Sequence, residues 1–293
     1  MSKIVCFGEV LWDVFPKHKK IGGAPLNVAI RLKSFTNEVA MISAVGNDDL
    51  AKPILETITN LEINSESVSI LDDYTTGEVT VTLNEKGAAT YKIVHPKAWD
   101  KIPFTEASEI LVRNCDAFVF GSLITRDAVS KNTLYQLLEL AKYAIFDVNL
   151  RAPFYTKEVL VDLMQKANFI KFNDDELYEI SGFLGSTFNN LEQNIHFISE
   201  KTNTKHICVT KGEHGAVLLY DNELFYNSGY KIKVKDTVGS GDSFLASLIS
   251  KLINGSTPQK AIDFACAVGA LVAKNEGANP KINEKEILDF SCL

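Results

Sequence analysis

The stretch Asp236-Thr237-Val238-Gly239-Ser240-Gly241-Asp242-Ser243-Phe244 runs directly into an apolar helical segment, residues 245–253. Small residues at 239–241 allow a tight turn that exposes backbone N–H groups. A helix that begins near Asp242 points the positive end of its dipole at the same place. Together these features predict a concavity that binds an anion such as phosphate. Asp242 at the mouth of the helix is either a candidate base or the N-cap of that helix.

A second glycine motif, Gly22-Gly23-Ala24-Pro25-Leu26-Asn27-Val28-Ala29, lies far upstream. The two glycines permit a close approach of the backbone to a ligand. Pro25 suits the first turn of a helix, and Asn27 would project from that turn with a donor and an acceptor. Taken alone, this motif predicts only a loop-to-helix junction.

Composition is that of a globular protein: of 293 residues, 46% are hydrophobic and 23% are charged. This length favours one large α/β domain over residues 1–293 rather than two equal ones. The net charge is −7 without a dense basic stripe, which argues against a nucleic acid as the partner. The only basic run, Lys17 to Lys20, is predicted to be a solvated loop.

The cysteines are scattered, and no pair forms Cys-x-x-Cys. Cys6, Cys208 and Cys266 lie in apolar runs and are predicted to be core residues of a protein in a reducing compartment. We see no signal peptide and no apolar segment of about 20 residues, which predicts a cytoplasmic protein without membrane contact. The histidines show no metal-ligand spacing.

Short apolar runs alternate with segments of helical periodicity along the chain. The predicted strands are 4–7, 39–44, 117–120, 144–148, 169–172, 206–209 and 216–220. The predicted helices are 26–34, 50–59, 129–142, 157–167, 190–201, 243–252 and 258–274. This alternation predicts an α/β fold with a mostly parallel sheet between two layers of helices. Ligands of such sheets bind outside the carboxyl ends of the strands.

Residues 76–94 break this pattern. Val79, Val81 and Leu83 alternate with threonines, and residues 84–87 form a predicted turn, which together indicate a hairpin. Trp12 and Val14 alternate similarly. We therefore expect a small antiparallel sheet, from about residues 10–21 and 74–97, that projects from the α/β body as a lid. The alternative is an extra hairpin at the edge of the main sheet.

Polar residues follow several predicted strands. Asp13 follows the first strand, and Asp147, Asn149 and Arg151 follow the strand 144–148. Arg151 is a candidate clamp for an anion, and Asp13 is either exposed to solvent or an acceptor for ligand hydroxyls.

Asn173 and Glu176 follow the strand 169–172 and carry hard oxygen ligands that suit Mg²⁺, whereas Asp174 between them is a candidate helix cap. The segment from Thr210 through Gly212 to residue 215 either cradles a nucleotide or is a plain hairpin. The chain contains no Walker A loop, and no Gly-x-Gly-x-x-Gly follows the first strand, which disfavours two common nucleotide folds.

Taken in order, these pieces resemble the PfkB, or ribokinase-like, family of sugar kinases. The resemblance rests on Phe7-Gly8-Glu9-Val10-Leu11-Trp12-Asp13, the Gly-Gly-Ala-Pro-x-Asn-Val-Ala motif, Asp147-x-Asn149-x-Arg151 and residues 236–242. It spans nearly the whole chain, and the Glu-Val-Leu-Trp-Asp segment looks most like bacterial fructokinases. One departure is Ser240, where relatives usually have alanine; because serine is also small, we expect little effect.

The resemblance implies a role for each motif. It implies Asp242 as the catalytic base and the amides of Gly239, Ser240, Gly241 and Asp242 as an anion hole. It further implies the following sets: Asp13, Gly23 and Asn27 for sugar hydroxyls; Asn173 and Glu176 for the water shell of Mg²⁺; Thr210 and Gly212 for ATP; and Asp236 and Val238, with Gly277 in the segment 272–277, for a monovalent cation such as K⁺.

The implied activity is transfer of the γ-phosphoryl group of ATP to a hydroxyl of fructose. Alternatives are a kinase of this family for ribose, 2-keto-3-deoxygluconate or a nucleoside, a catalytically idle sugar-binding regulator, and, disfavoured by the missing fingerprint, a nucleotide-binding oxidoreductase. Many relatives pair two subunits through the lid, so a homodimer is also expected.

Overall fold

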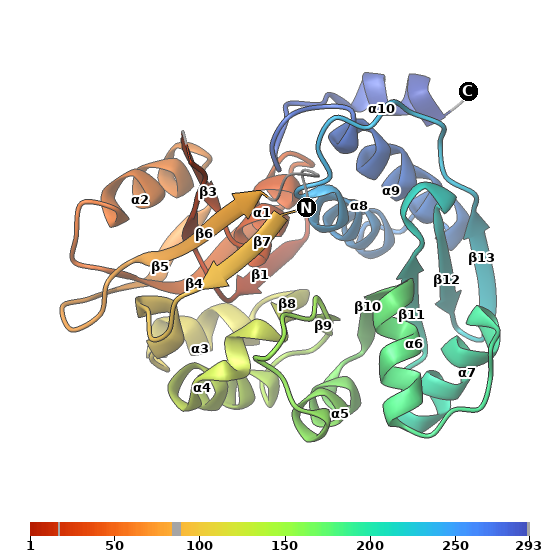
Figure 1. Cartoon of the computed structure of the whole chain (residues 1–293), viewed down its shortest axis with the longest axis horizontal. Coiled ribbons are helices and arrows are strands. Elements are labelled where there is room, and N and C mark those ends of the chain that lie inside the picture. The colour runs from red at the N-terminus through yellow and green to blue at the C-terminus, as the bar shows by residue number, and fades with distance from the viewer. Residues whose placement is uncertain (17, 84–88, 292–293) are drawn as a thin grey trace.

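The computed structural model describes residues 1–16, 18–83 and 89–291. Within these ranges a central sheet contains nine strands in the order β13-β12-β11-β10-β9-β8-β1-β4-β5 (Figure 1). The strands are β1 (Lys3–Phe7), β4 (Glu38–Gly46), β5 (Asn64–Leu71), β8 (Ala117–Gly121), β9 (Ala144–Asp147), β10 (Phe169–Asn173), β11 (His206–Thr210), β12 (Ala216–Tyr220) and β13 (Glu223–Asn227). Neighbouring strands from β11 through β10, β9, β8, β1 and β4 to β5 pair in parallel. At the other edge, β12 pairs antiparallel with both β11 and β13. The predicted mostly parallel sheet is confirmed.

Helices cover both faces of this sheet. One face packs against α1 (Ala24–Lys33), α2 (Ala51–Asn60), α8 (Ser240–Ile253) and α9 (Pro258–Ala273). The other face packs against α3 (Glu106–Arg113), α4 (Ala128–Leu138), α5 (Lys157–Lys166), α6 (Asp174–Phe183) and α7 (Leu191–Thr202). The last helix, α10 (Glu284–Ser291), packs on α9. The result is the predicted three-layer α/β/α arrangement with a hydrophobic core on each side of the sheet.

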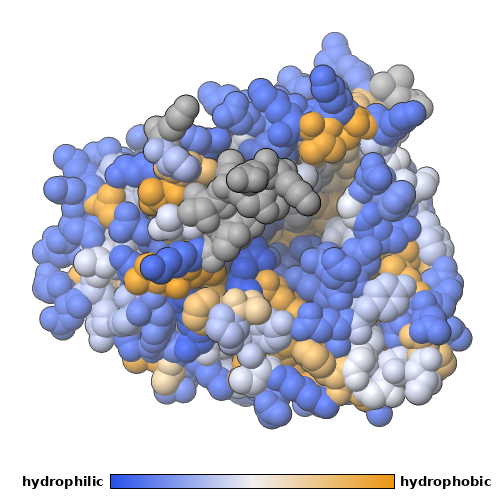
Figure 2. Space-filling view, viewed as in Figure 1, coloured by the Kyte–Doolittle hydropathy of each residue, from blue (hydrophilic) through white to orange (hydrophobic). Residues whose placement is uncertain are grey.

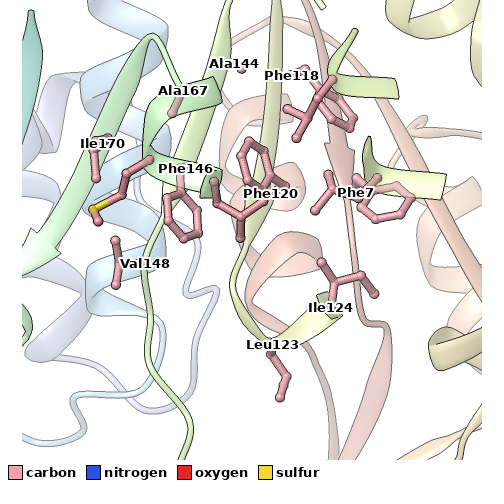
Figure 3. Packing of buried hydrophobic residues seen from close by; sticks show 14 of the residues in the cluster. Phe7, Phe118, Phe120, Leu123, Ile124, Ala144, Phe146, Val148, Ala167 and Ile170 are labelled. Atoms are coloured by element: carbon pink, nitrogen blue, oxygen red, sulfur yellow. The ribbon is translucent and has the colours of Figure 1, made fainter. Parts of the chain in front are cut away.

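A row of aromatic rings fixes the middle of the sheet (Figure 3). Phe7, Phe118, Phe120 and Phe146 come from β1, β8 and β9, and successive ring centroids lie 6.0, 6.0 and 5.1 Å apart. All four rings are buried. Burying each contributes about 1.5–3 kcal/mol, so this row holds together the strands whose carboxyl ends carry the polar motifs.

A second sheet lies beside the first, and we call it the lid sheet (Figure 1). Its strands, in the order β3-β2-β6-β7, are β2 (Leu11–Val14), β3 (Lys19–Gly22), β6 (Gly77–Leu83) and β7 (Ala89–Ile93). Because the described residues form a separate sheet, the alternative of an edge hairpin on the main sheet is wrong. The sheet is also not wholly antiparallel, since β2 pairs parallel with β6.

One expectation about this region changes. Lys19 and Lys20 belong to β3, so the prediction of a solvated loop is wrong for them, while Lys17 lies outside the described residues. The predicted turn at 84–87 also lies outside them. Trp12 anchors the lid sheet to the body because its Nε1 donates a hydrogen bond of 2.9 Å to the carbonyl of Leu50.

Sequence patterns missed β5, β13, α3 and α10, and gave no range for α6. The two strands are the edges of the main sheet, so few of their side chains are buried and their apolar pattern is weak. Cys6, Cys208 and Cys266 are buried as predicted. Among the helices of the described ranges, none combines the length and apolarity that a bilayer crossing requires.

Candidate active site

Helix α8 begins at the glycine turn of residues 239–241. Gly239 is its N-cap, with φ 74° and ψ 0°, and Ser240 is its first residue. A Cβ at position 239 would lie 2.5 Å from Cα of Ala278, so no larger residue fits without displacing the backbone. Asp242 therefore lies inside the first turn of α8, and the alternative that it is the N-cap is wrong.

The free amides of this turn lie where the sequence predicts an anion site. The amide of Ser240 donates to the carbonyl of Thr237 at 3.2 Å, and its Oγ donates to the carbonyl of Gly269 at 2.9 Å. For the amides of Gly241 and Asp242 no acceptor occurs in the described part of the chain. The amide of Ser240, one of the predicted anion-hole donors, is thus already engaged, and its side chain ties α8 to α9.

The two glycine motifs meet between helices α1 and α8. Asn27 of α1 donates from Nδ2 to Oδ2 of Asp242 at 2.8 Å, and Asn27 is only 5% exposed. One turn further along α1, Arg31 donates from Nε to Oγ of Ser243 at 3.1 Å and from Nη2 to the carbonyl of Pro280 at 2.9 Å. The structure thus brings together two residues, Asn27 and Asp242, that were assigned to the sugar and to catalysis.

Gly23 stands at the start of α1 with φ 110°. A Cβ there would overlap the carbonyl oxygen of Glu9, which makes glycine obligatory. Glu9 itself is buried, and burial raises the pKa of its carboxyl to about 7. Sequence reasoning gave Glu9 no role, although a glutamate inside the otherwise apolar run 4–12 was a signal of a buried carboxylate.

Arg151 lies near three carboxyl groups. It is exposed, and its one hydrogen bond within the described residues goes from Nη1 to the carbonyl of Leu150 at 2.9 Å. Burial raises the pKa of Asp13 to about 6, and the positive charge of Arg151 counteracts that rise; it also lowers the pKa of Glu9 and Asp242. Arg151, the predicted anion clamp, therefore lies near these carboxyl groups but forms no ion pair with a carboxylate of the described residues.

A buried ion pair lies under the first turn of α8. Nζ of Lys171 lies 3.0 Å from Oδ1 of Asp147 and 3.5 Å from the position of a Cβ at Gly241. Burial alone would lower the pKa of Lys171, but Asp147, Glu176 and Asp242 outweigh it and raise that pKa, so Lys171 is a cation. Sequence reasoning missed Lys171; the available signal was a lysine within the buried strand 169–172.

These charges set the acidity of the candidate base. Burial and, after it, the negative charge of Asp147 raise the pKa of Asp242 to about 6. The hydrogen bond from Asn27 and the positive charges of Lys171 and Arg151 act in the opposite direction. At neutral pH Asp242 is therefore ionised and able to accept a proton.

Asn173 and Glu176 form the N-terminal capping box of α6. Oδ1 of Asn173 accepts from the amide of Glu176 at 2.8 Å, and Oε2 of Glu176 accepts from the amide of Asn173 at 2.8 Å. Oε1 of Glu176 accepts from the amide of Leu150 at 2.9 Å. The alternative that Asp174 caps this helix is thus wrong. Each carboxylate oxygen of Glu176 keeps a second lone pair for a further hydrogen bond. Asn173 and Glu176 therefore fit a magnesium ion that they would contact through water.

Thr210 and Gly212 lie at the carboxyl end of β11, which connects to β12 in an antiparallel hairpin. Thr210 is the register partner of Asn173 on β10, and its Oγ1 donates to the carbonyl of Phe172 at 3.3 Å. Gly212 is exposed with φ 55°, and a Cβ there would meet nothing within 4 Å. The segment is thus a hairpin, and it lies beside the predicted magnesium residues. A hairpin at this place is compatible with the other alternative, a segment that cradles a nucleotide.

The three residues predicted for a monovalent cation also come together. Oδ1 of Asp236 accepts from the amide of Val238 at 3.0 Å, and Oδ2 accepts from the amide of Gly277 at 2.9 Å. Lys20 of the lid sheet lies beside this loop, 3.6 Å from Glu276. Asp236 therefore joins the turn before α8 to the loop after α9. Within the described residues no group of His, Cys, Asp or Glu side chains is arranged to bind a metal directly.

A cavity of about 620 Å³ adjoins this loop and the base of the lid sheet. Four predicted site residues line it, namely Asp13, Asp236, Val238 and Gly277. Asp242 and Asn27 are not among the lining residues, so this cavity lies next to the candidate base and does not contain it. Figure 2 shows the molecule hollowed beside the lid sheet, with apolar residues inside the hollow.

Known proteins share this chain's sequence pattern and fold. Residues 1–285 match the family model described as pfkB family carbohydrate kinase. Fructokinase-2 of Solanum lycopersicum is 26% identical over 310 residues, which cover 95% of this chain and 92% of the relative. A structure of fructokinase from Vibrio cholerae O395 with fructose, ADP and calcium ion has a TM-score of 0.85 at 22% identity and covers 99% of both chains.

A further solved structure is aminoimidazole riboside kinase from Salmonella enterica with aminoimidazole riboside and an ATP analog. Its TM-score is 0.83 at 21% identity, with 99% of both chains covered. These structures share the fold, and the family match over residues 1–285 spans all the motifs that build the site above. This chain therefore belongs to the pfkB family of carbohydrate kinases.

Proposed function

We propose that this protein is a fructokinase, which transfers the γ-phosphoryl group of ATP to a hydroxyl of fructose and gives fructose 6-phosphate. The observation that carries the proposal is the pair formed by Asp242 at the open start of α8 and Asn27 of the sugar-side motif, 2.8 Å apart. Fructose as the acceptor is supported by the fructokinases among the relatives.

Asp242 acts on the acceptor hydroxyl. Its Oδ2 is engaged by Asn27, which leaves Oδ1 to accept the hydrogen bond of the hydroxyl. The transition state of phosphoryl transfer is loose, so a carboxylate is a sufficient base and its position matters more than its strength. The proton passes to Asp242 as the new phosphate ester bond forms.

The start of α8 stabilises the migrating phosphoryl group. The amides of Gly241 and Asp242, which have no acceptor among the described residues, and the positive end of the helix dipole stabilise the negative charge that develops there. Each well-placed donor of this kind contributes about 3–4 kcal/mol. The ammonium group of Lys171, beside Gly241, adds a fixed positive charge behind these amides.

The remaining residues bind and orient the two substrates. Asp13, Gly23 and Asn27 bind the sugar hydroxyls, and Arg151 binds an anionic group at the same end. Thr210 and Gly212 line the nucleotide, and Asn173 with Glu176 would hold the water shell of Mg²⁺, which neutralises phosphate charge when bound. Asp236, Val238 and Gly277 remain the proposed position of a monovalent cation.

The lid sheet completes the proposal. Its closure over the sugar would exclude water and so prevent hydrolysis of ATP. A homodimer through the lid sheet and a cytoplasmic location remain predictions.

A coupled assay of ADP formation over a panel of acceptors tests this function. The panel contains fructose, ribose, 2-keto-3-deoxygluconate and a nucleoside, each with ATP and Mg²⁺. We expect the highest kcat/KM for fructose. A higher value for another acceptor would overturn the fructose assignment, and fructose binding without any ADP formation would identify an idle sugar-binding protein.

Asp242→Asn provides the active-site control. It should lower kcat by about 10²–10⁴-fold while calorimetric fructose binding is largely retained, because only proton acceptance is lost. Asp175→Asn removes the same charge from an exposed position of α6 and should leave turnover unchanged. Wild-type turnover in Asp242→Asn would remove Asp242 from the mechanism.

A further inference from the structure

Asp242, Asn27 and a third residue, Asn279, form a continuous line of hydrogen bonds. Asn27 donates from Nδ2 to Oδ2 of Asp242 at 2.8 Å, and Asn279 donates from Nδ2 to Oδ1 of Asn27 at 2.8 Å. The three residues come from α8, from α1 and from the loop between α9 and α10. No motif in the sequence marked Asn279.

The direction of this line follows from the chemistry of its first member. An ionised carboxylate only accepts hydrogen bonds, so Asn27 must turn its NH₂ group toward Asp242. The carbonyl of the Asn27 amide then faces Asn279, which must present its own NH₂ group. The order of donors and acceptors is therefore fixed from Asp242 outward.

The Asn279 side chain makes no other hydrogen bond within the described residues, although it also lines the cavity described above. Its Oδ1 is buried and has no hydrogen-bond partner there. The loop around it is held by other contacts: Gly277 donates to Asp236 at 2.9 Å, and Arg31 donates to the carbonyl of Pro280 at 2.9 Å. Loss of the Asn279 side chain would therefore leave the loop anchored on both sides.

We infer that Asn279 is a positioning residue for the catalytic base. By donating to Asn27 it prevents the Asn27 amide from rotating, so Nδ2 stays on Asp242 and Oδ1 of Asp242 stays free for the acceptor hydroxyl. This inference rests on the proposed role of Asp242 as the base. Without Asn279 the carboxylate alone orients the Asn27 amide. Orientations in which the Asn27 carbonyl faces Asp242 then become accessible when Asp242 is protonated, which favours the protonated form over the ionised one.

The charged groups around Asp242 do not depend on this line. Asp147 and Lys171 face it from the central sheet, and Glu9 and Arg151 face it from the sugar side. None of them hydrogen-bonds Asn279 in the described structure. A shift in the titration of Asp242 upon changing Asn279 would therefore report the orientation of Asn27.

Three substitutions separate orientation from charge. Asn279→Ala removes the donor and lets Asn27 rotate. Asn279→Asp replaces the donor by an acceptor, which draws Nδ2 of Asn27 away from Asp242. Asn283→Asp is the matched control, because it adds the same charge to the same loop at a position that caps α10 by accepting from Glu286 at 2.8 Å.

The first readout is independent of turnover. In protein labelled with ¹³C-aspartate, the carboxyl resonance of Asp242, assigned by its loss in Asp242→Asn, is titrated without sugar. We expect its midpoint to rise by about one pH unit in Asn279→Ala and further in Asn279→Asp, since a hydrogen bond to a charged group is lost or reversed. Asn283→Asp should change it much less.

The second readout is the pH profile of kcat/KM for the acceptor. Its acid limb should move to higher pH in the same order, and Asn279→Gln, which retains an NH₂ donor, should move it back toward wild type. An Asp242 midpoint that is equal in wild type, Asn279→Ala and Asn279→Asp overturns the inference. If the midpoints shift but no acceptor is phosphorylated by wild type, the proposed function fails and the orientation by Asn279 stands.

Discussion

Lys171 and Asp147 form an ion pair at the carboxyl end of the central sheet, with Nζ and Oδ1 3.0 Å apart and the two side chains 8% and 6% exposed. The pair follows from strand register, because Lys171 and Asp147 are partners in the parallel pairing of β10 with β9. Their side chains therefore point to the same face, which α8 covers. The strands thus place a positive charge behind the amides of α8 and a negative charge beside the base.

Lys171→Gln should both destabilise the fold and move the pH profile. It leaves Asp147 buried and unpaired, and Oδ2 of Asp147 already lacks a hydrogen-bond partner among the described residues, so we expect a loss of about 3–5 kcal/mol in urea unfolding at pH 7. Removal of the positive charge should also raise the pKa of Asp242 and shift the acid limb of kcat/KM upward.

The double variant Asp147→Asn/Lys171→Gln separates the two effects. With both charges gone, most of the stability should return, because no buried charge is left without a partner. The pKa of Asp242 should also return toward that of wild type, since Asp147 raises it and Lys171 lowers it. A double variant as unstable as Lys171→Gln would contradict this account of the pair.

The activity should fall as the pH decreases through about 6. The pKa of Asp242 is raised to about 6 by burial and by Asp147, and only its ionised form accepts the proton. Asp13 titrates in the same range, because burial raises its pKa to about 6 as well. In Asp13→Asn the KM for sugar should rise while the acid limb stays in place; disappearance of the limb there would assign it to Asp13.

Glu9 should cost stability at neutral and higher pH. Burial raises its pKa from 4.5 to about 7, so the folded chain holds its proton over a range in which the unfolded chain has lost it. The stability that the protonated Glu9 carboxyl contributes is fully present below about pH 4.5 and is lost as the pH rises through 7. Glu9→Gln should therefore gain about 1–3 kcal/mol in unfolding free energy at pH 8 relative to pH 4.

The control for Glu9→Gln is the same substitution at an exposed glutamate of α7, Glu200→Gln, measured by urea unfolding at both pH values. It should show no such difference. An equal change in unfolding free energy between pH 4 and pH 8 for the two variants would mean that burial does not raise the pKa of Glu9.

Gly239→Ala should be more damaging than Gly255→Ala. Both glycines have positive φ, 74° and 85°, so each alanine should cost about 1 kcal/mol in backbone strain. A Cβ at Gly255 would meet nothing within 4 Å, whereas one at Gly239 would meet Ala278 at 2.5 Å. Only Gly239→Ala should therefore lose a further amount of about 1–3 kcal/mol and, because α8 shifts, most turnover. Equal unfolding free energies of Gly239→Ala and Gly255→Ala would show that Ala278 moves aside at no energetic cost.

Hydrogen exchange tests the lid sheet. Peptides from residues 76–83 and 89–94 should exchange more slowly when fructose is added, because closure over the sugar would shield their amides. Peptides from α7, which packs beside β11 and lies far from the lid sheet in Figure 1, serve as the internal reference and should not change. Unchanged exchange in β6 and β7 at saturating fructose would argue against closure.

Sequence patterns could predict the fold class and could mark Asn27 and Asp242 as separate candidate site residues, because both depend on local rules. Alternating apolar runs specify strands and helices, and a glycine turn before a helix specifies an exposed helix start. The parallel pairing of β2 with β6 could not be predicted, since it joins segments more than 60 residues apart through the arrangement of the whole sheet.

Lys171 and Asn279 were missed for a different reason. Each acquires its role from a partner that only the tertiary structure supplies: Asp147 through strand register, and Asn27 through the packing of a loop on α1. A lysine in an apolar strand is a detectable anomaly, whereas an asparagine in a polar loop is not. Residues that act through another side chain therefore escape a search for motifs.

The contact of α1 with α8 also bears on the order in which the site is built during synthesis. Chains fold from the N-terminus as they leave the ribosome, and Asn27 emerges long before Asp242 and Asn279. The hydrogen-bonded line joins residues separated by 215 and 252 positions, so it closes only when almost the entire chain has been made. A nascent or truncated chain would carry the sugar-side motif without its base, and could not turn over ATP before its own synthesis was nearly finished.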